Sequence, residues 1–202
     1  MKKQNKSTTL SFDTDHRIKI KKCKSFIRKL NREPFLAVIA HFDLPCSTQK
    51  IIVNQRKTIT EMLTHNKICN DIVVANGGQV IKKMGDAVLA IFSNFPSACE
   101  CALNVIHNFR KHQRGIHTKV TITVGTVEEI STRTEPDIYG AAVNLCERMS
   151  KYADEDSILI EESRFEEVSH WLPKDKRIKI CHPREEDLRE FRTLSLRKIT
   201  LV

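Results

Sequence analysis

The chain has 202 residues, 40% of them hydrophobic and 29% charged, which suits one well-buried domain and is short for two. No apolar run exceeds about seven residues, which excludes a transmembrane helix. The lysines at the start are not followed by a hydrophobic signal core, which argues against secretion. Seven cysteines without a Cys-x-x-Cys pair indicate neither a disulfide scaffold nor a zinc finger. We therefore expect a cytoplasmic protein with reduced thiols.

The net charge of +9 is confined to the N-terminus. Residues 1–32 hold 11 Lys and Arg against 2 acidic residues, and residues 33–202 hold 23 of each kind. We interpret residues 1–32 as a partly disordered basic arm and residues 33–202 as the folded domain. Such an arm is typical of a solvated leader, and its charge also suits contact with an anionic surface.

The first half of the domain predicts a strand, a long helix and a hairpin. Residues 35–42 form a short apolar run typical of a buried strand. Residues 48–75 lack Gly and Pro and repeat apolar side chains at helical spacing, and Asn76-Gly77-Gly78 then ends the helix. Residues 79–84 and 87–92 are two strands joined at Gly85-Asp86.

The second half continues with a helix at 96–112, a strand at 119–127 and a polar stretch without periodicity at 128–136. A helix at 140–153, a strand at 157–160 and a helix at 161–170 follow, and 178–181 and 194–202 are β-like. This order predicts an α+β fold with a ferredoxin-like βαββαβ core and a C-terminal αβ extension.

Several polar residues in this frame suit chemistry. Asp43 closes the first strand and Asp86 lies at the hairpin tip, so the two carboxylates are expected at one end of the sheet, where a divalent cation would neutralise them. Strand alternation puts Lys82 on the same face as Val80 and Met84, which places it at a boundary or a cleft. Taken singly, each also fits an ordinary turn aspartate or a surface lysine.

The helix at 140–153 carries Asn144 and Arg148 four residues apart, opposite its apolar stripe. Periodicity alone describes a solvated face there. Together, however, the spacing resembles that of the class III nucleotidyl cyclases, the adenylate and guanylate cyclase catalytic domains. The resemblance runs from about residue 37 to 167, and is strongest in Gly77–Phe92 and in Asp137–Arg148, which reads Asp-x-x-Gly-x-x-Val-Asn-x-x-x-Arg.

The resemblance implies a role for each residue. Asp43, Asp86 and the Leu44 carbonyl match the ligands of two Mg²⁺ or Mn²⁺ ions. Lys82 and Asp137 match the pair that reads adenine in adenylate cyclases. Asn144 matches the residue that orients the ribose, and Arg148 the one that stabilises charge on the α-phosphate.

The implied enzyme is a phosphorus–oxygen lyase that converts a nucleoside triphosphate to a 3′,5′-cyclic nucleotide and pyrophosphate, with ATP slightly favoured. In this family one subunit supplies the metal ligands and the other the nucleotide contacts, so the resemblance also implies a homodimer with composite sites.

The chain departs from the family pattern at two places. Where relatives read Asp-Ile-x-Gly-Phe-Thr, this chain has Cys46 and Ser47 in place of the Gly and the Phe. The late family lysine that meets the terminal phosphates has no clear counterpart, and three residues are candidates: Lys174, Lys176 and Lys179.

Three alternatives remain open. The unusual pocket and the compact chain also fit a pyrimidine cyclase that acts on CTP or UTP and produces an antiphage second messenger. An inactive cyclase-like module that binds a nucleotide or a partner is a second alternative. An RNA-binding ferredoxin-like module is the least favoured, because residues 79–84 carry no aromatic side chain for base stacking.

Overall fold

The computed structural model describes residues 33–113, 115–131, 136–170, 172 and 177–201. The expected basic arm, residues 1–32, lies outside the described residues. Within them, no helix is both long and apolar enough to cross a membrane. The elements in chain order are β1 (Phe35–Asp43), α2 (Ser47–Val53), α3 (Gln55–Ala75), β2 (Gln79–Met84), β3 (Ala87–Phe92), α4 (Phe95–His112), β4 (Lys119–Ser131), β5 (Pro136–Tyr139), α5 (Ala141–Met149), β6 (Ser157–Glu161), α6 (Glu166–Ser169), β7 (Ile178–Ile180), β8 (Arg184–Asp187) and β9 (Thr193–Leu201).

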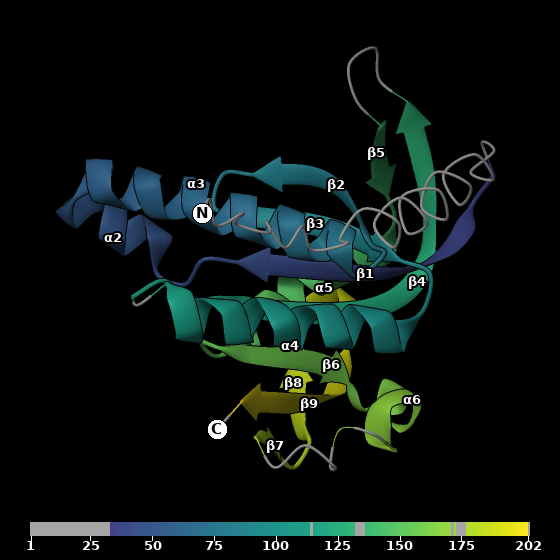
Figure 1. Ribbon diagram of the computed structural model, residues 1–202. Coiled ribbons are helices and arrows are strands. Elements are labelled where there is room, and N and C mark those ends of the chain that lie inside the picture. Colours follow the sequence, from purple (N-terminus) through teal and green to yellow (C-terminus); the bar gives the residue numbers. More distant parts are fainter. Residues whose placement is uncertain (1–32, 114, 132–135, 171, 173–176, 202) are drawn as a thin grey trace, which may run out of the picture.

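Over the described ranges, the strands form one sheet with the order β2-β3-β1-β4-β6-β9-β7, and β5 and β8 pair with β4 and β9 (Figure 1). The first four strands alternate in direction, with β1 antiparallel to both β3 and β4. This is the predicted ferredoxin-like core, and β6 extends it by pairing parallel to β4. The predicted fold class is therefore confirmed.

Helices cover both faces of the sheet. One face packs against α3 and α4, through a core that includes Val73, Phe92 and Phe109. On the other face, Ile39 and Leu89 of the sheet pack against Ala142 and Cys146 of α5. Figure 1 shows α3 and α4 on the nearer side of the strands and α5 behind them. The helix with the Asn144–Arg148 pattern therefore has a separate face of the sheet from the two long helices.

The single helix expected at 48–75 is wrong, because the chain forms two helices that meet at Asn54. This residue has an extended φ of −151°, and its side chain accepts a hydrogen bond from the Lys57 N–H at 3.1 Å. Asparagine is a strong N-cap, because its side chain satisfies a free backbone donor of the first turn. The predicted end of the helix is confirmed: Gly77 takes a φ of +77° just beyond Ala75.

Three other boundaries also differ from the prediction. The strand expected to end at Val127 runs to Ser131, where its polar end pairs with β5 as a two-stranded ribbon. Such a ribbon needs little burial, so it leaves no strong alternation in the sequence. The helix predicted to reach 153 ends at Met149 and continues as a short 3₁₀ turn. The predicted 161–170 helix is a 3₁₀ turn followed by α6.

Candidate active site

The two candidate metal-binding aspartates lie at the same end of the sheet. Asp43 is the last residue of β1, and Ala87, which follows Asp86, is its direct partner across β1 and β3. The Leu44 N–H donates a hydrogen bond to the Asp86 carbonyl at 3.3 Å. The two turns are thus joined through the backbone, as expected for carboxylates that close neighbouring strands.

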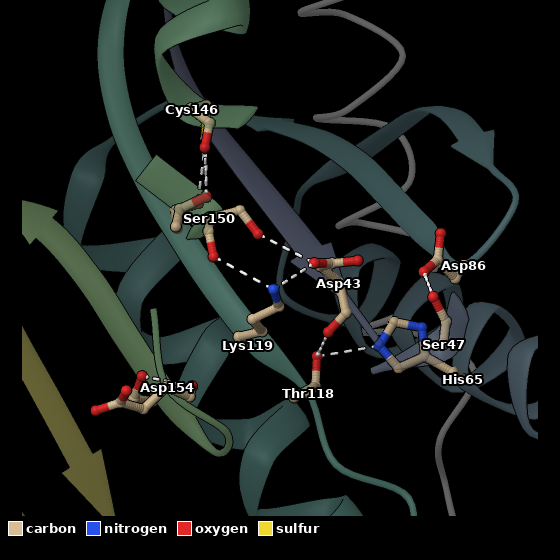
Figure 2. Close-up of polar contacts among 11 residues, drawn as sticks. Asp43, Ser47, His65, Asp86, Thr118, Lys119, Cys146, Ser150 and Asp154 are labelled. Atoms are coloured by element: carbon tan, nitrogen blue, oxygen red, sulfur yellow. Dashed lines mark hydrogen bonds and ion pairs between the residues drawn. The ribbon is translucent and has the colours of Figure 1, made fainter. Parts of the chain in front are cut away.

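Asp43 is held by a cation and a hydroxyl that the sequence did not reveal as part of the site (Figure 2). Lys119, opposite Asp43 in the β1–β4 register, places Nζ 2.9 Å from its Oδ2. The Ser150 hydroxyl donates to the same oxygen at 3.1 Å, and Lys119 also donates to the Ser150 carbonyl at 3.3 Å. The carboxylate is largely buried, with 17% of its side chain exposed. One of its oxygens is therefore already neutralised within the protein.

Asp86 accepts a hydrogen bond from the Ser47 hydroxyl at the start of α2 (Figure 2). Cys46, just before, has a φ of +58° and a ψ of +23°, which is the left-handed conformation. This conformation favours glycine, which explains why the class III pattern has glycine at this position. Cys46 thus has a backbone conformation that glycine adopts more readily.

The donor set suits a metal that shares its ligands with a substrate. Among the described residues, no group of three or more His, Cys, Asp or Glu side chains could hold a metal ion. Mg²⁺ is commonly held by one or two carboxylates together with substrate phosphates rather than by an all-protein cage. Asp43 and Asp86 thus fit a site that a triphosphate would complete.

Lys82 and Asp137 are 55 residues apart in the sequence and lie side by side in the structure. The Lys82 Nζ is 3.2 Å and 3.3 Å from the two carboxylate oxygens of Asp137. Asp137 also accepts a hydrogen bond from the Ile138 N–H at 2.8 Å, and the Lys82 ammonium lies 5.6 Å from the centre of the Tyr139 ring. Both charged side chains remain partly exposed, at 27% and 22%. They form a donor beside an acceptor that a ligand can reach.

A β-bulge in β2 determines the face of the sheet on which Lys82 lies. The β2–β3 register shifts between Val80 and Lys82, so that Val80 faces Ala90 and Lys82 faces Leu89. Val80 therefore packs with the core on the α3–α4 face, and Leu89 belongs to the core on the α5 face. The simple alternation that put Val80 and Lys82 on one face is wrong, because the bulge adds a residue between them.

Asn144 and Arg148 lie on the outward side of α5, as the periodicity predicted. Asn144 is exposed, and the Arg148 guanidinium lies 3.4 Å from the Glu190 carboxylate. Both line a surface hollow with Glu190 and Phe191. The helix is seated closely on β4, because a Cβ at Gly125 would lie 2.5 Å from that of Ala142. Over the described residues, no hydrogen bond or ion pair connects Asn144 or Arg148 with Asp43 or Asp86.

Of the three candidates for the late family lysine, only Lys179 lies among the described residues, and it is not near the carboxylates. Lys174 and Lys176 lie outside the described residues. Lys179 lies on β7, four strands from β1 in the sheet order, or about 19 Å at ordinary strand spacing. Lys119 is instead the lysine that contacts a site carboxylate.

The buried thiols and imidazoles near the site are not nucleophiles or bases at neutral pH. Burial raises the pKa of the Cys146 thiol to about 12 and lowers the pKa of the His65 imidazole to about 4. Burial also lowers the pKa of His41, whose Nδ1 is buried without a hydrogen-bond partner. Chemistry at this site therefore falls to the carboxylates and to the exposed cations.

Comparison with known proteins agrees with this geometry. No protein-family model matches the chain. An adenylate cyclase of Streptomyces coelicolor is 32% identical over 98 residues, which are 48% of this chain and 25% of that protein. The chain thus spans about a quarter of the length of this curated relative.

Solved structures of cyclase domains share the fold, two of which illustrate the range. An adenylate cyclase of Trypanosoma brucei in its monomeric state has a TM-score of 0.72 at 13% identity, covering 83% of this chain and 88% of that one. A dimeric guanylyl cyclase domain from the aquatic fungus Blastocladiella emersonii has a TM-score of 0.63 at 17% identity, covering 84% and 98%. The neighbours thus include both monomeric and dimeric forms.

Proposed function

Because this chain has the fold of the class III nucleotidyl cyclase catalytic domains and resembles an adenylate cyclase in sequence, we propose that it converts a nucleoside triphosphate to a 3′,5′-cyclic nucleotide and pyrophosphate. One observation carries the proposal. Lys82 and Asp137, which the resemblance pairs as base-reading residues, lie 3.2 Å apart although they come from distant parts of the sequence. Both side chains remain partly exposed, so their donor and acceptor can meet the edge of a nucleotide base.

The pair selects a base by its hydrogen-bonding edge. A lysine only donates and a carboxylate only accepts, so the matching base has an acceptor ring nitrogen beside an exocyclic amine. Adenine has this pattern at N1 and N6, and cytosine has it at N3 and N4. Guanine and uracil present a carbonyl and a ring N–H instead. The edge pattern leaves ATP and CTP, and because the sequence resembles adenylate cyclases, we propose ATP as the favoured substrate.

CTP is the second candidate, because the same edge pattern fits Lys82 and Asp137 equally well. A cyclic CMP product would suit the antiphage signalling that remained an alternative for a compact chain with an unusual pocket. UTP is a poorer fit, since the N3–H of uracil would point a donor at the lysine. Which of the two amino-bearing bases is used depends on the width of the pocket.

Asp43, Asp86 and the Leu44 carbonyl are proposed to hold two Mg²⁺ or Mn²⁺ ions. When bound, these ions would lower the pKa of the ribose 3′-hydroxyl and neutralise the triphosphate. Asn144 orients the ribose, and Arg148 places a fixed positive charge where negative charge develops on the α-phosphate. Lys119 adds a cation beside Asp43, where it can offset the charge of the polyphosphate.

The proposed enzyme is a homodimer. Lys82 lies within β2, whereas Asp86 lies in the turn beyond the end of that strand, and among the described residues no contact joins the two side chains. The Arg148 guanidinium likewise pairs with Glu190, and among the described residues no ion pair joins it to Asp43 or Asp86. A second copy that faces the first would bring the nucleotide-contacting groups of one subunit to the carboxylates of the other.

Product analysis tests this function. Purified protein is incubated separately with ATP, CTP, GTP and UTP in Mn²⁺ or Mg²⁺, and the products are identified by mass spectrometry. We expect cyclic AMP, or cyclic CMP as the second candidate, and loss of the product in the Asp43→Asn/Asp86→Asn variant. Absence of a product from all four triphosphates, with a folded dimer, would instead favour a binding module. A cyclic GMP product would contradict the base assignment alone.

A further inference from the structure

We propose that His65 and Asn66, adjacent residues on α3, are positioning residues that hold the Asp86 turn and the start of β4 in a fixed relation. They do so through one chain of hydrogen bonds behind the candidate metal site. The importance of this chain for catalysis rests on the proposed cyclase function. The mechanical connection between the Asp86 turn and the start of β4 does not depend on that function, because it involves only groups of the protein.

Asn66 holds the hairpin turn. Its side-chain amide donates to the Gly85 carbonyl at 2.8 Å, immediately before Asp86. Gly85 has a φ of +64°, so the turn depends on a left-handed residue whose conformation Asn66 can stabilise. Asn66 is 8% exposed, and an amide buried to this degree needs its partners. The Asp86 turn is therefore anchored to α3 from within the protein.

His65 holds the start of β4. Its Nε2 lies 3.0 Å from the hydroxyl of Thr118, the residue before Lys119 (Figure 2). The Thr118 hydroxyl is also 3.5 Å from the Asp43 carbonyl. Lys119 in turn pairs with the Asp43 carboxylate. The imidazole thus contacts the segment that carries the counter-charge of Asp43.

The contact between His65 and Asn66 determines which atoms donate and which accept along this series of hydrogen bonds. The His65 Nδ1 lies 3.4 Å from the Asn66 side-chain oxygen. Because that oxygen can only accept, Nδ1 carries the proton, and Nε2 accepts from the Thr118 hydroxyl at 3.0 Å. That hydroxyl has a single proton, so its longer approach to the Asp43 carbonyl is then a polar contact only. With its oxygen turned to His65, Asn66 presents its NH₂ group to Gly85. Every donor between Thr118 and Gly85 then faces an acceptor.

The residues around His65 fix the orientation of its ring and keep it neutral. The imidazole is fully buried and stacks on Phe109, with ring centroids 5.3 Å apart and an interplanar angle of 9°. Packing therefore fixes the ring plane, and burial keeps the ring neutral by lowering its pKa. A simple packing role would not require polar contacts at both turns. Here, His65 contacts Thr118, which precedes the counter-ion Lys119, and Asn66 contacts Gly85, which precedes the candidate ligand Asp86.

Hydrogen exchange measured by mass spectrometry on the full-length protein tests the coupling directly. The variants are Asn66→Ala and His65→Leu, which break the chain, and His65→Gln, whose amide can still reach Thr118. The matched control is Val73→Ala, which removes a fully buried side chain from the same helix but no hydrogen bond of the chain. We expect exchange of residues 84–88 to rise about tenfold in the two chain-breaking variants. The increase should be smaller in His65→Gln, and Val73→Ala should leave this segment unchanged.

A second readout connects the coupling to the metal. In Mn²⁺ titrations of cyclic nucleotide formation, the Mn²⁺ concentration at half-maximal rate should rise about tenfold in Asn66→Ala. The substrate KM at saturating Mn²⁺ should stay within about twofold. Equal exchange in Asn66→Ala and Val73→Ala would overturn the positioning role. If the wild type forms no cyclic nucleotide, the proposed function fails, and the exchange comparison still decides the coupling.

Discussion

The carboxylate end of the sheet and the outward face of α5 carry complementary parts of the candidate site in very different states. Asp43 and Asp86 each have internal partners: Lys119 and Ser150 for Asp43, and Ser47 for Asp86. Asn144 is exposed, and Arg148 pairs with the Glu190 carboxylate, which is itself 65% exposed. One region is fixed by the fold, and the other is open to a ligand.

This difference follows from what each region must hold. Two carboxylates at one end of a sheet repel each other, so the folded protein needs neighbouring cations and donors to keep them there. A cation that meets a phosphate gains most when it stays accessible and its own partner is weak. The comparison therefore predicts that substitutions at the carboxylate end affect stability as well as activity. Substitutions on α5 should affect activity almost alone.

The largest effect should come from mixing two inactive variants. Asp43→Asn removes a proposed metal ligand, and Arg148→Ala removes the cation proposed to meet the phosphate, so each alone should lower the rate by about 10²–10³-fold. In a mixed dimer, one site combines the intact carboxylates of one subunit with the intact α5 of the other. Random mixing should then restore about one quarter of the wild-type rate. The measurement is cyclic nucleotide formation after the two variants exchange subunits, and a mixture as inactive as its components would place both regions in one chain.

The next effect concerns the base-reading pair. Lys82→Met removes a charged hydrogen bond and leaves Asp137 without its partner, so kcat/KM for the preferred triphosphate should fall between about tenfold and a hundredfold. The ratio of kcat/KM for the preferred triphosphate to kcat/KM for GTP should fall at the same time. Lys83→Met is the matched control, because Lys83 is exposed on the same strand, and its effect should stay within about twofold. Initial rates with ATP, CTP and GTP measure both, and similar losses in the two variants would remove Lys82 from base recognition.

The carboxylate end should also give the protein a pH-dependent stability. The folded-state pKa of His65 is about 4, below its reference value of 6.5, so the unfolded chain binds more protons between these values. The contribution is present above pH 6.5 and is lost as the pH falls toward 4. Between pH 7 and pH 5 this histidine should cost about 2 kcal/mol of unfolding free energy. Urea unfolding of the wild type and of His65→Gln at both pH values measures the difference, which vanishes if His65 protonates freely in the folded protein.

The sequence predicts the carboxylate end in outline and misses its supports. Asp43 and Asp86 could be placed together because each ends a strand and the two strands are neighbours in the predicted core. Lys119 could not, because its position opposite Asp43 depends on the β1–β4 register. The roles of His65 and Asn66 were equally hidden, since a polar residue on a helix shows its burial only once the helix is packed.

The residues proposed to contact the nucleotide came from the resemblance, and local patterns alone would have left them on a solvated face. The bulge between Val80 and Lys82 makes the prediction from strand alternation wrong, because side chains alternate between faces only where the register is unbroken. Asn54 is different, since an asparagine inside a helical pattern is a recognisable N-cap signal. The structure adds the Lys82–Asp137 contact, whereas the roles given to Asn144 and Arg148 stay predictions that the kinetic experiments address.

The smallest expected effect examines the open face of α5. Arg148 and Glu190 are 35% and 65% exposed, and an ion pair of this kind contributes less than about 0.5 kcal/mol. Glu190→Gln should therefore leave the unfolding free energy nearly unchanged, while the freed guanidinium lowers the triphosphate KM by about twofold. Glu185→Gln, at an exposed position on β8, controls for the loss of one negative charge. If Glu190→Gln instead costs more than about 1 kcal/mol of stability, Arg148 is fixed by the fold as firmly as Asp43. The contrast between a preformed carboxylate end and an open phosphate-binding face would then no longer hold.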